Sequence, residues 1–198
     1  MTPAPRLTLA SKSASRAALL RGAGVAFEMV GSGVDEEATK QEMLHAGPKA
    51  VAAALAVQKA LAVARTTPGL VIGADQTLDL GGVLFDKAES LTEARDRLML
   101  LRGTTHQLHS AVALAQDGAV VWEETVSASL TMRDFSDAYL DGYLESGGQA
   151  LLGSVGCYML ETQGVHLFEQ IDGDYFTILG LPLFGLFGEL RRRGVLAT

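Results

Sequence analysis

Short apolar runs alternate along the chain with stretches in which apolar residues recur every three or four positions. The first pattern predicts buried strands, and the second predicts amphipathic helices. The expected strands cover residues 6–10, 27–30, 70–74, 107–115, 120–130 and 164–171. The expected helices cover residues 13–21, 45–65, 92–101, 136–145 and 183–193. Because strands and helices alternate from end to end, the pattern predicts an α/β protein.

Two turn signals refine this prediction. Gln116-Asp117-Gly118 separates two apolar runs and predicts a β-hairpin, which adds antiparallel pairing to the sheet. Gly81-Gly82 predicts a second turn, followed by a short strand that returns Lys87 toward the same end of the sheet as the strand 70–74. The sheet is therefore expected to be mixed rather than purely parallel.

Composition narrows the classes of partner. The chain has 16 Lys and Arg against 23 Asp and Glu residues, a formal net charge of −7, so general binding to nucleic acid is not expected. A local basic pocket for a small anion remains open. The single cysteine, Cys157, excludes an intramolecular disulfide, and its apolar neighbours favour a buried thiol. Residues 1–6 lack the pattern of a signal peptide and no apolar run is long enough to cross a bilayer, so a cytoplasmic protein without a membrane partner is expected.

The apolar run at residues 70–74 ends in Asp75, followed by Gln76. If this run is a strand, Asp75 stands at its carboxyl end, where open α/β sheets bind their ligands. A carboxylate there must be solvated, paired or bound to a cation, because burying it alone costs too much. An ordinary turn aspartate at the end of a strand is the alternative.

A possible phosphate site follows the first strand. The segment Ser11-Lys12-Ser13-Ala14-Ser15-Arg16 leads into the first helix, whose initial N–H groups favour an anion. Ser11 and Ser13 can donate hydroxyl hydrogen bonds, and Arg16 can donate two in parallel. The alternative is that Ser13 or Ser15 only caps the helix while Arg16 is solvated.

Further charged residues could complete such a site. Lys59 has mostly apolar neighbours on its helix, so it either extends its ammonium to the surface or directs it to an anion in a cleft. Asp35-Glu36-Glu37 offers carboxylates that could hold a cation together with Asp75, or it could be a solvated loop. The chain has neither a lysine-bearing phosphate loop nor the histidine spacing of a zinc-protease helix, and 153–156 does not match a nucleophile elbow.

Taken together, these segments resemble the Maf family of nucleoside triphosphate pyrophosphatases, in the family's order and over nearly the whole chain. The matching segments are Leu9-Ala10-Ser11, Ser13, Arg16, Asp35-Glu36, Leu55-Ala56, Lys59-Ala60, Ile72-Gly73-Ala74-Asp75-Gln76, Lys87, Val155-Gly156, Tyr158, Glu161, Gly164, Ile171-Asp172-Gly173-Asp174-Tyr175 and Gly180-Leu181-Pro182-Leu183. The resemblance implies an elongated mixed sheet with flanking helices and a central nucleotide cleft, similar to the inosine triphosphate pyrophosphatases. It implies one Maf-like domain over residues 1–198, in which two lobes could flank the cleft.

The resemblance also implies a reaction: a nucleoside triphosphate and water give a monophosphate and pyrophosphate, with a divalent metal cation, Mg²⁺ or Mn²⁺. Asp75 matches the family's catalytic acid, and Asp75 with Glu36 would hold the metal. The positions that match phosphate-binding residues of the family are Ser11, Ser13, Arg16, Lys59 and Lys87.

Three positions bear on the base. Gln76 and Glu161 resemble the subtype that acts on 7-methyl-GTP, and a carboxylate at 161 suits the two adjacent donors of guanine. Ser15 departs from the Trp or Arg that separates the subtypes, which removes a stacking surface. Ala14 and Ala88 replace two prolines of the family's motifs, which loosens loops. The alternatives are a pyrimidine (dTTP or UTP) pyrophosphatase and a non-catalytic nucleotide-binding regulator of cell division; a homodimer is a possible assembly.

Overall fold

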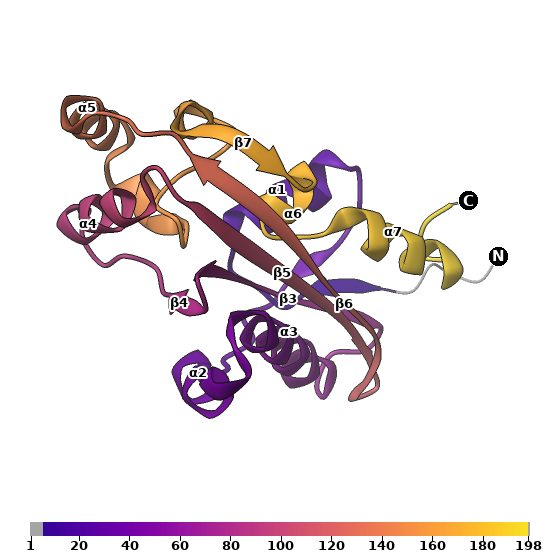
Figure 1. Cartoon of the computed structure of the whole chain (residues 1–198). Helices are drawn as coiled ribbons and strands as arrows, with labels where there is room; N and C mark the ends of the chain where they lie inside the picture. The colour runs from indigo at the N-terminus through magenta and orange to yellow at the C-terminus, as the bar shows by residue number, and fades with distance from the viewer. Residues whose placement is uncertain (1–5, 198) are drawn as a thin grey trace.

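The computed structural model describes residues 6–197, and these form a mixed sheet with the strand order β2-β1-β3-β5-β6-β7 and β4 paired to β3 (Figure 1). The strands are β1 (Leu7–Leu9), β2 (Glu28–Met29), β3 (Leu70–Leu80), β4 (Val83–Phe85), β5 (Thr105–Gln116), β6 (Ala119–Met132) and β7 (Phe168–Asp172). β1 pairs in parallel with β2 and β3, whereas the remaining pairs are antiparallel. The predicted mixed α/β sheet and the hairpin between β5 and β6 are confirmed.

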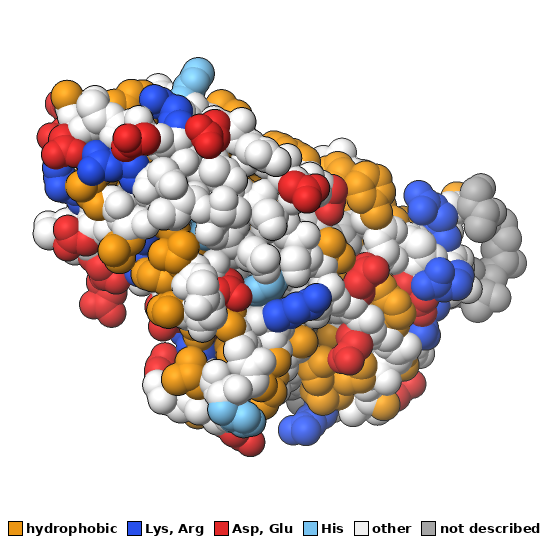
Figure 2. Space-filling model, in the orientation of Figure 1, with side chains coloured by type: hydrophobic (Ala, Val, Ile, Leu, Met, Phe, Trp, Pro, Cys, Tyr) orange, Lys and Arg blue, Asp and Glu red, His pale blue; other side chains and the backbone are white. Residues whose placement is uncertain are grey.

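Helices cover the sheet and extend beyond both of its ends. They are α1 (Ala14–Gly22), α2 (Glu36–Met43), α3 (Pro48–Ala64), α4 (Leu91–Leu101), α5 (Asp137–Gly147), α6 (Tyr175–Ile178) and α7 (Leu183–Arg192), with short 3₁₀ turns η1 (Leu44–Ala46), η2 (Gly148–Gly153) and η3 (Gln163–Leu167). Figure 1 shows α4 and α5 at one end of the long strands and α7 toward the other, which makes the molecule elongated. Lys and Arg side chains are mixed with Asp and Glu over the face seen in Figure 2.

Small residues bring α3 unusually close to the sheet. A Cβ atom on Gly73 of β3 would lie 2.1 Å from the carbonyl oxygen of Ala56 and 2.4 Å from the nitrogen of Ala60. Any larger residue at position 73 would push the helix away, because backbone atoms cannot yield as a flexible side chain can. This close approach places Lys59 of α3 directly beside Asp75 of β3.

The strand expected at 70–74 is longer than predicted. β5 pairs with β3 as far as Asp79, so Asp75 lies in the middle of the strand and not at its carboxyl end. The partner on the other edge is shorter, since β1 ends at Leu9, opposite Ile72. Among the described strands, none pairs with residues 73–77 on that edge. The opening in the sheet therefore forms where β1 ends rather than where β3 ends, and the rule that ligands bind at such a point still applies.

Two other predictions on local structure are corrected. The acidic segment 35–37, considered as a solvated loop, begins helix α2: the Asp35 carboxylate accepts a hydrogen bond from the Ala38 N–H (3.1 Å). Carboxylates favour the first turn of a helix, where they offset the helix dipole. The segment 164–171 was expected to be one strand, but its first half is the 3₁₀ turn η3, and only 168–172 pairs with β6.

Cys157 is fully buried, as its neighbours suggested, and burial raises the pKa of its thiol. In the part of the chain that the structure describes, no helix is both long and apolar enough to span a membrane. Residues 1–5, at which a signal peptide was not expected, lie outside the described residues.

Candidate active site

A cleft of about 1060 Å³ runs along the open edge of β3. Its walls come from the β1–α1 segment, from α2 and α3, from the β4–α4 loop, and from residues 153–161 and 178–180. The structure brings every predicted site residue to this cleft: Ser11, Ser13, Ser15, Arg16, Glu36, Lys59, Asp75, Gln76, Lys87 and Glu161.

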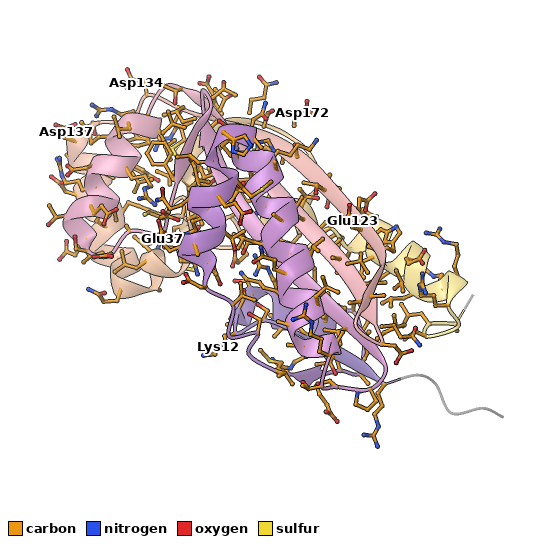
Figure 3. The ribbon with its side chains drawn as sticks, turned by 90° about the horizontal axis from the view of Figure 1, so that it is seen from below. Lys12, Glu37, Glu123, Asp134, Asp137 and Asp172 are labelled. Carbon is orange, nitrogen blue, oxygen red and sulfur yellow. The ribbon has the colours of Figure 1, made fainter. Side chains whose placement is uncertain are left out.

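An ion cluster lies on the α3 side of the cleft. The Lys59 ammonium contacts Asp75 Oδ1 at 2.6 Å and Glu36 Oε1 at 2.8 Å. Lys59 is 5% exposed and Asp75 is 7% exposed, so the pair is largely removed from water. Glu36 comes from α2, which lies directly beside α3 (Figure 3). Of the two possibilities for Lys59, the structure shows the ammonium directed at carboxylates in a cleft.

The opposite face of β3 carries a second polar group, because successive side chains of a strand point to opposite faces. Gln76 Nε2 lies 2.9 Å from the Ser110 hydroxyl and 3.0 and 2.9 Å from the carbonyl oxygens of Thr177 and Ile178. Carbonyl oxygens only accept hydrogen bonds, so they determine which end of the amide faces α6. The nitrogen of Gln76 thus holds α6 to the sheet, and Oε1 is the atom left for a ligand.

The β1–α1 segment combines the two roles considered for it. Ser13 is the N-cap of α1 and accepts a hydrogen bond from the Arg16 N–H (3.4 Å). Ser11, buried beneath it, accepts one from the Ser13 N–H (3.1 Å). Arg16 is not free in solvent: its Nε donates to the Gly180 carbonyl (2.9 Å) and one terminal nitrogen donates to Ser11 Oγ (3.4 Å). This arrangement directs the guanidinium along the cleft.

Three cations that line the cleft have no ion-pair partner among the described residues. They are Lys12, Arg16 and Lys87, whereas Lys59 is paired as above and Lys40 of α2 pairs with Asp86. Burial lowers the pKa of Arg16 from its ordinary value. Partial burial and repulsion from Arg16 lower the pKa of Lys87. An anion bound between these two groups would relieve both effects, because it would favour their charged forms.

The ion pair of Lys40 and Asp86 is a contact that sequence analysis did not find. It joins α2 to the residue preceding Lys87, and Lys40 also lies 3.6 Å from Glu37, which Figure 3 shows on α2. The two partners are 46 positions apart and each belongs to an unremarkable charged segment. No local pattern marks such a pair, so only the folded chain reveals it.

Ser15 and Glu161 are exposed on the walls of the cleft. A tight turn presents Glu161: the Thr162 N–H donates to the Met159 carbonyl (3.2 Å), and a Cβ on Gly164 would lie 2.4 Å from that same oxygen. Among the described residues, no hydrogen bond or ion pair engages the Glu161 carboxylate. It is therefore available to a ligand.

The described residues contain no group of three or more His, Cys, Asp or Glu side chains that could enclose a metal ion. Asp75 and Glu36 nevertheless converge on one ammonium, and each has a second carboxylate oxygen outside that contact. Mg²⁺ in phosphate-binding sites commonly uses one or two carboxylates, with phosphate oxygens and water as its other ligands. The two residues fit that kind of partial site, which needs the substrate to be complete.

Comparison with known proteins agrees with this geometry. The sequence model of the family described as "Maf-like protein" matches residues 6–193. The chain belongs to the Maf family. It is 59% identical to a Caulobacter vibrioides protein named nucleoside triphosphate pyrophosphatase, over 97% of this chain and 98% of that protein. It is 50% identical to a Paramagnetospirillum magneticum protein of the same name, over 95% and 98%. It is 46% identical to a Brucella abortus protein named 7-methyl-GTP pyrophosphatase, over 94% and 96%.

Membership of the Maf family confirms the resemblance inferred from the motifs, and it accords with the elongated mixed sheet. The relatives carry two names, and one of them specifies a methylated guanine nucleotide. In this Maf protein, the two residues that resemble the subtype acting on 7-methyl-GTP, Gln76 and Glu161, both line the cleft.

Proposed function

We propose that this Maf protein hydrolyses nucleoside triphosphates to a monophosphate and pyrophosphate, with 7-methyl-GTP preferred. The observation that carries the proposal is the buried Lys59–Asp75 pair, open to a cleft that also holds Arg16 and Lys87, two cations that no described carboxylate pairs with. A buried pair of this kind adds little to stability, because desolvation offsets the attraction between its charges. Catalysis explains it better, and the names of the relatives support the same reaction.

Binding of the triphosphate requires that its charge be compensated. The first N–H groups of α1 and the Ser11 hydroxyl offer hydrogen bonds to phosphate oxygens. Arg16 and Lys87 supply positive charge that no described carboxylate pairs with, so both can bind the phosphates and stabilise pyrophosphate as it leaves. These contacts orient the chain of phosphates along the cleft toward Asp75.

Asp75 is the group that acts on water. Its Oδ1 is held by Lys59 at 2.6 Å, which fixes the orientation of the carboxylate and directs the remaining oxygen to the cleft. A carboxylate so placed can accept a proton from water as the water attacks the α-phosphorus. Lys59 thereby positions the base and adds positive charge beside the developing anion.

Mg²⁺ or Mn²⁺ is the proposed cofactor. Asp75 and Glu36 would hold the cation, which would supply charge neutralisation at the phosphates when bound. Lys59 already lies between the same two carboxylates, so its ammonium keeps them close together in the absence of a cation. The chain thus brings the two oxygen ligands together before the substrate arrives.

Selection of the base is assigned to Glu161 and to Oε1 of Gln76. A carboxylate accepts hydrogen bonds from the ring N–H and the exocyclic amine of guanine, and it complements the positive charge that methylation adds. A pyrimidine such as uracil presents only one ring N–H. Ser15 provides no aromatic surface for stacking, a contact worth about 0.5–2 kcal/mol, so the preference for 7-methyl-GTP should be shallower than with Trp at this position.

The deciding experiment measures pyrophosphate release from a panel of standard and methylated triphosphates with Mg²⁺ or Mn²⁺. Asp75→Asn keeps the shape of the side chain and is expected to lower kcat by about a hundredfold or more. Asp134→Asn is the matched control, because that side chain, labelled in Figure 3, is 91% exposed and is not among the residues that line the cleft. Turnover of Asp75→Asn within about threefold of the parent would remove Asp75 from the mechanism. Binding without turnover in the parent would favour the non-catalytic regulator.

A further inference from the structure

Arg97 of α4 is a buried charge outside the ion cluster just described. Its side chain is 6% exposed, and its guanidinium makes contacts on three sides. One terminal nitrogen donates to the carbonyl oxygens of Asp86 and of Val155, the latter at 2.8 Å. The other donates to Glu93 Oε1 at 3.0 Å. The Phe85 ring lies beneath it, 5.4 Å from the guanidinium carbon to the ring centroid.

The two carbonyl oxygens belong to different walls of the cleft. Asp86 immediately precedes Lys87, which is assigned to the phosphates. Val155 lies in the segment that runs through residues 153–161 to Glu161, which is assigned to the base. One planar guanidinium therefore joins the segment that carries the phosphate-binding lysine to the segment that carries the base-reading glutamate.

The chemistry of arginine suits this position. Its guanidinium stays charged at every physiological pH, and its fixed planar donors hold their acceptors in a defined geometry. Without it, the carbonyl oxygens of Asp86 and Val155 would lose their shared donor, and the two segments could move apart. Lysine keeps the charge but has a single nitrogen, which cannot reproduce the same set of planar contacts.

We propose that Arg97 is a positioning residue that sets the distance between Lys87 and Glu161 and so determines how well the cleft selects its base. The proposal rests on the proposed function for the identity of the substrate. A residue that only supported folding would lower the active fraction for every substrate alike. If a residue sets this spacing, its replacement changes KM, and the change is largest for the substrate whose base contacts Glu161.

The test compares the parent with Arg97→Met, Arg97→Lys and the control Arg95→Met. Arg95 lies on the same helix but is more exposed, and it pairs with the exposed Asp141 at 3.1 Å. For each protein, kcat and KM are measured with 7-methyl-GTP and with UTP. Dissociation constants for their non-hydrolysable α,β-methylene analogues are measured by calorimetry, which provides a reading independent of turnover.

For Arg97→Met we expect KM and the dissociation constant for the 7-methylguanosine compounds to rise about tenfold, and those for the uridine compounds less than about threefold. Arg97→Lys should fall between Arg97→Met and the parent, and Arg95→Met should match the parent. An equal loss of kcat for both substrates with unchanged KM and affinity would overturn the proposal. So would parental behaviour of Arg97→Met.

Other outcomes also decide between the two proposals. If Arg97→Met does not fold, Arg97→Lys carries the test, and an unchanged ratio of the two affinities in that variant overturns the role of Arg97. If the parent binds the analogues but does not hydrolyse triphosphates, the proposed function fails while the affinities still test Arg97. If the parent binds neither analogue, both proposals fall.

Discussion

Replacing Lys59 with Met should destabilise the protein more than any neutral change at Asp75. The methionine can follow the apolar part of the lysine side chain, so the packing of α3 against β3 is retained. What disappears is the ammonium, which contacts Asp75 at 2.6 Å and Glu36 at 2.8 Å. Asp75, 7% exposed, is then left as a carboxylate without its ion-pair partner.

The magnitude follows from this burial. Removing one partner of a buried ion pair costs about 3–5 kcal/mol, and we expect about 3 kcal/mol here because Asp75 also lines an open cleft. Asp75→Asn should cost only about 1 kcal/mol, since Lys59 keeps Glu36 as a partner. The double variant should lose about 1–2 kcal/mol less stability than the sum of the losses in the two single variants, because neither Lys59 nor Asp75 is then left as a buried charge without its partner.

Urea unfolding of the four proteins, followed by the fluorescence of Trp122, measures these differences. Trp122 is the only tryptophan of the chain, so its signal reports on one site. All three variants should also lose hydrolysis although their losses of stability differ, so the loss of activity does not follow from the loss of stability. Equal midpoints for Lys59→Met and the parent would show that the ammonium is not buried against Asp75, and the proposed site would lose its central contact.

Three further predictions concern pH and the base. The pKa of Lys87 lies below the ordinary 10.5, so this lysine loses its charge before the pH reaches that value. As the pH is raised, KM for the triphosphate should therefore begin to rise before pH 10.5, and in Lys87→Arg the rise should begin at a higher pH. Identical profiles of KM against pH for the parent and Lys87→Arg would contradict this prediction. Burial lowers the pKa of His106 from 6.5 to about 4. The folded state therefore disfavours the protonated form, so about 3 kcal/mol of stability should be lost as pH falls from about 6.5 to 4. In His106→Phe the urea midpoint should change less between pH 6.5 and 4 than it does in the parent. An equal change in both proteins would contradict the assignment of this pH dependence to His106. Glu161→Gln should lower the preference for 7-methyl-GTP over UTP in kcat/KM about tenfold, and an unchanged ratio would exclude Glu161 from base selection.

The helices and strands that could be predicted are those whose own residues carry a clear local pattern. The α/β alternation was predictable because burial on one face of an element imposes a period that the sequence must carry. A serine cap at Ser13 or Ser15 was predictable because unpaired N–H groups at a helix start need a nearby acceptor, and the structure shows that Ser13 is the cap. Helix α2 was missed because Thr39 is its one buried residue, so its sequence carries hardly any helical period of apolar positions.

The candidate site was predictable in its residue types but not in its contacts. Because Asp75 follows an apolar run, the sequence predicted that its carboxylate needs a partner. Its neighbours in the sequence did not identify Lys59 as that partner, since the helix of Lys59 is apolar on nearly every side. The pair depends on the absence of a side chain at Gly73, which lets α3 approach the sheet. The open edge of β3 depends on how early β1 ends.

The contacts of Gln76 and Arg97 belong to the tertiary structure alone. Gln76 holds carbonyl oxygens about a hundred positions away, and Arg97 contacts the carbonyl oxygen of Val155, 58 positions away. The sequence by itself determined which groups need a partner, because that need is a property of each residue and its immediate neighbours. Which partner each group meets was decided only by the tertiary structure, since packing brings together backbone atoms that carry no mark in the sequence.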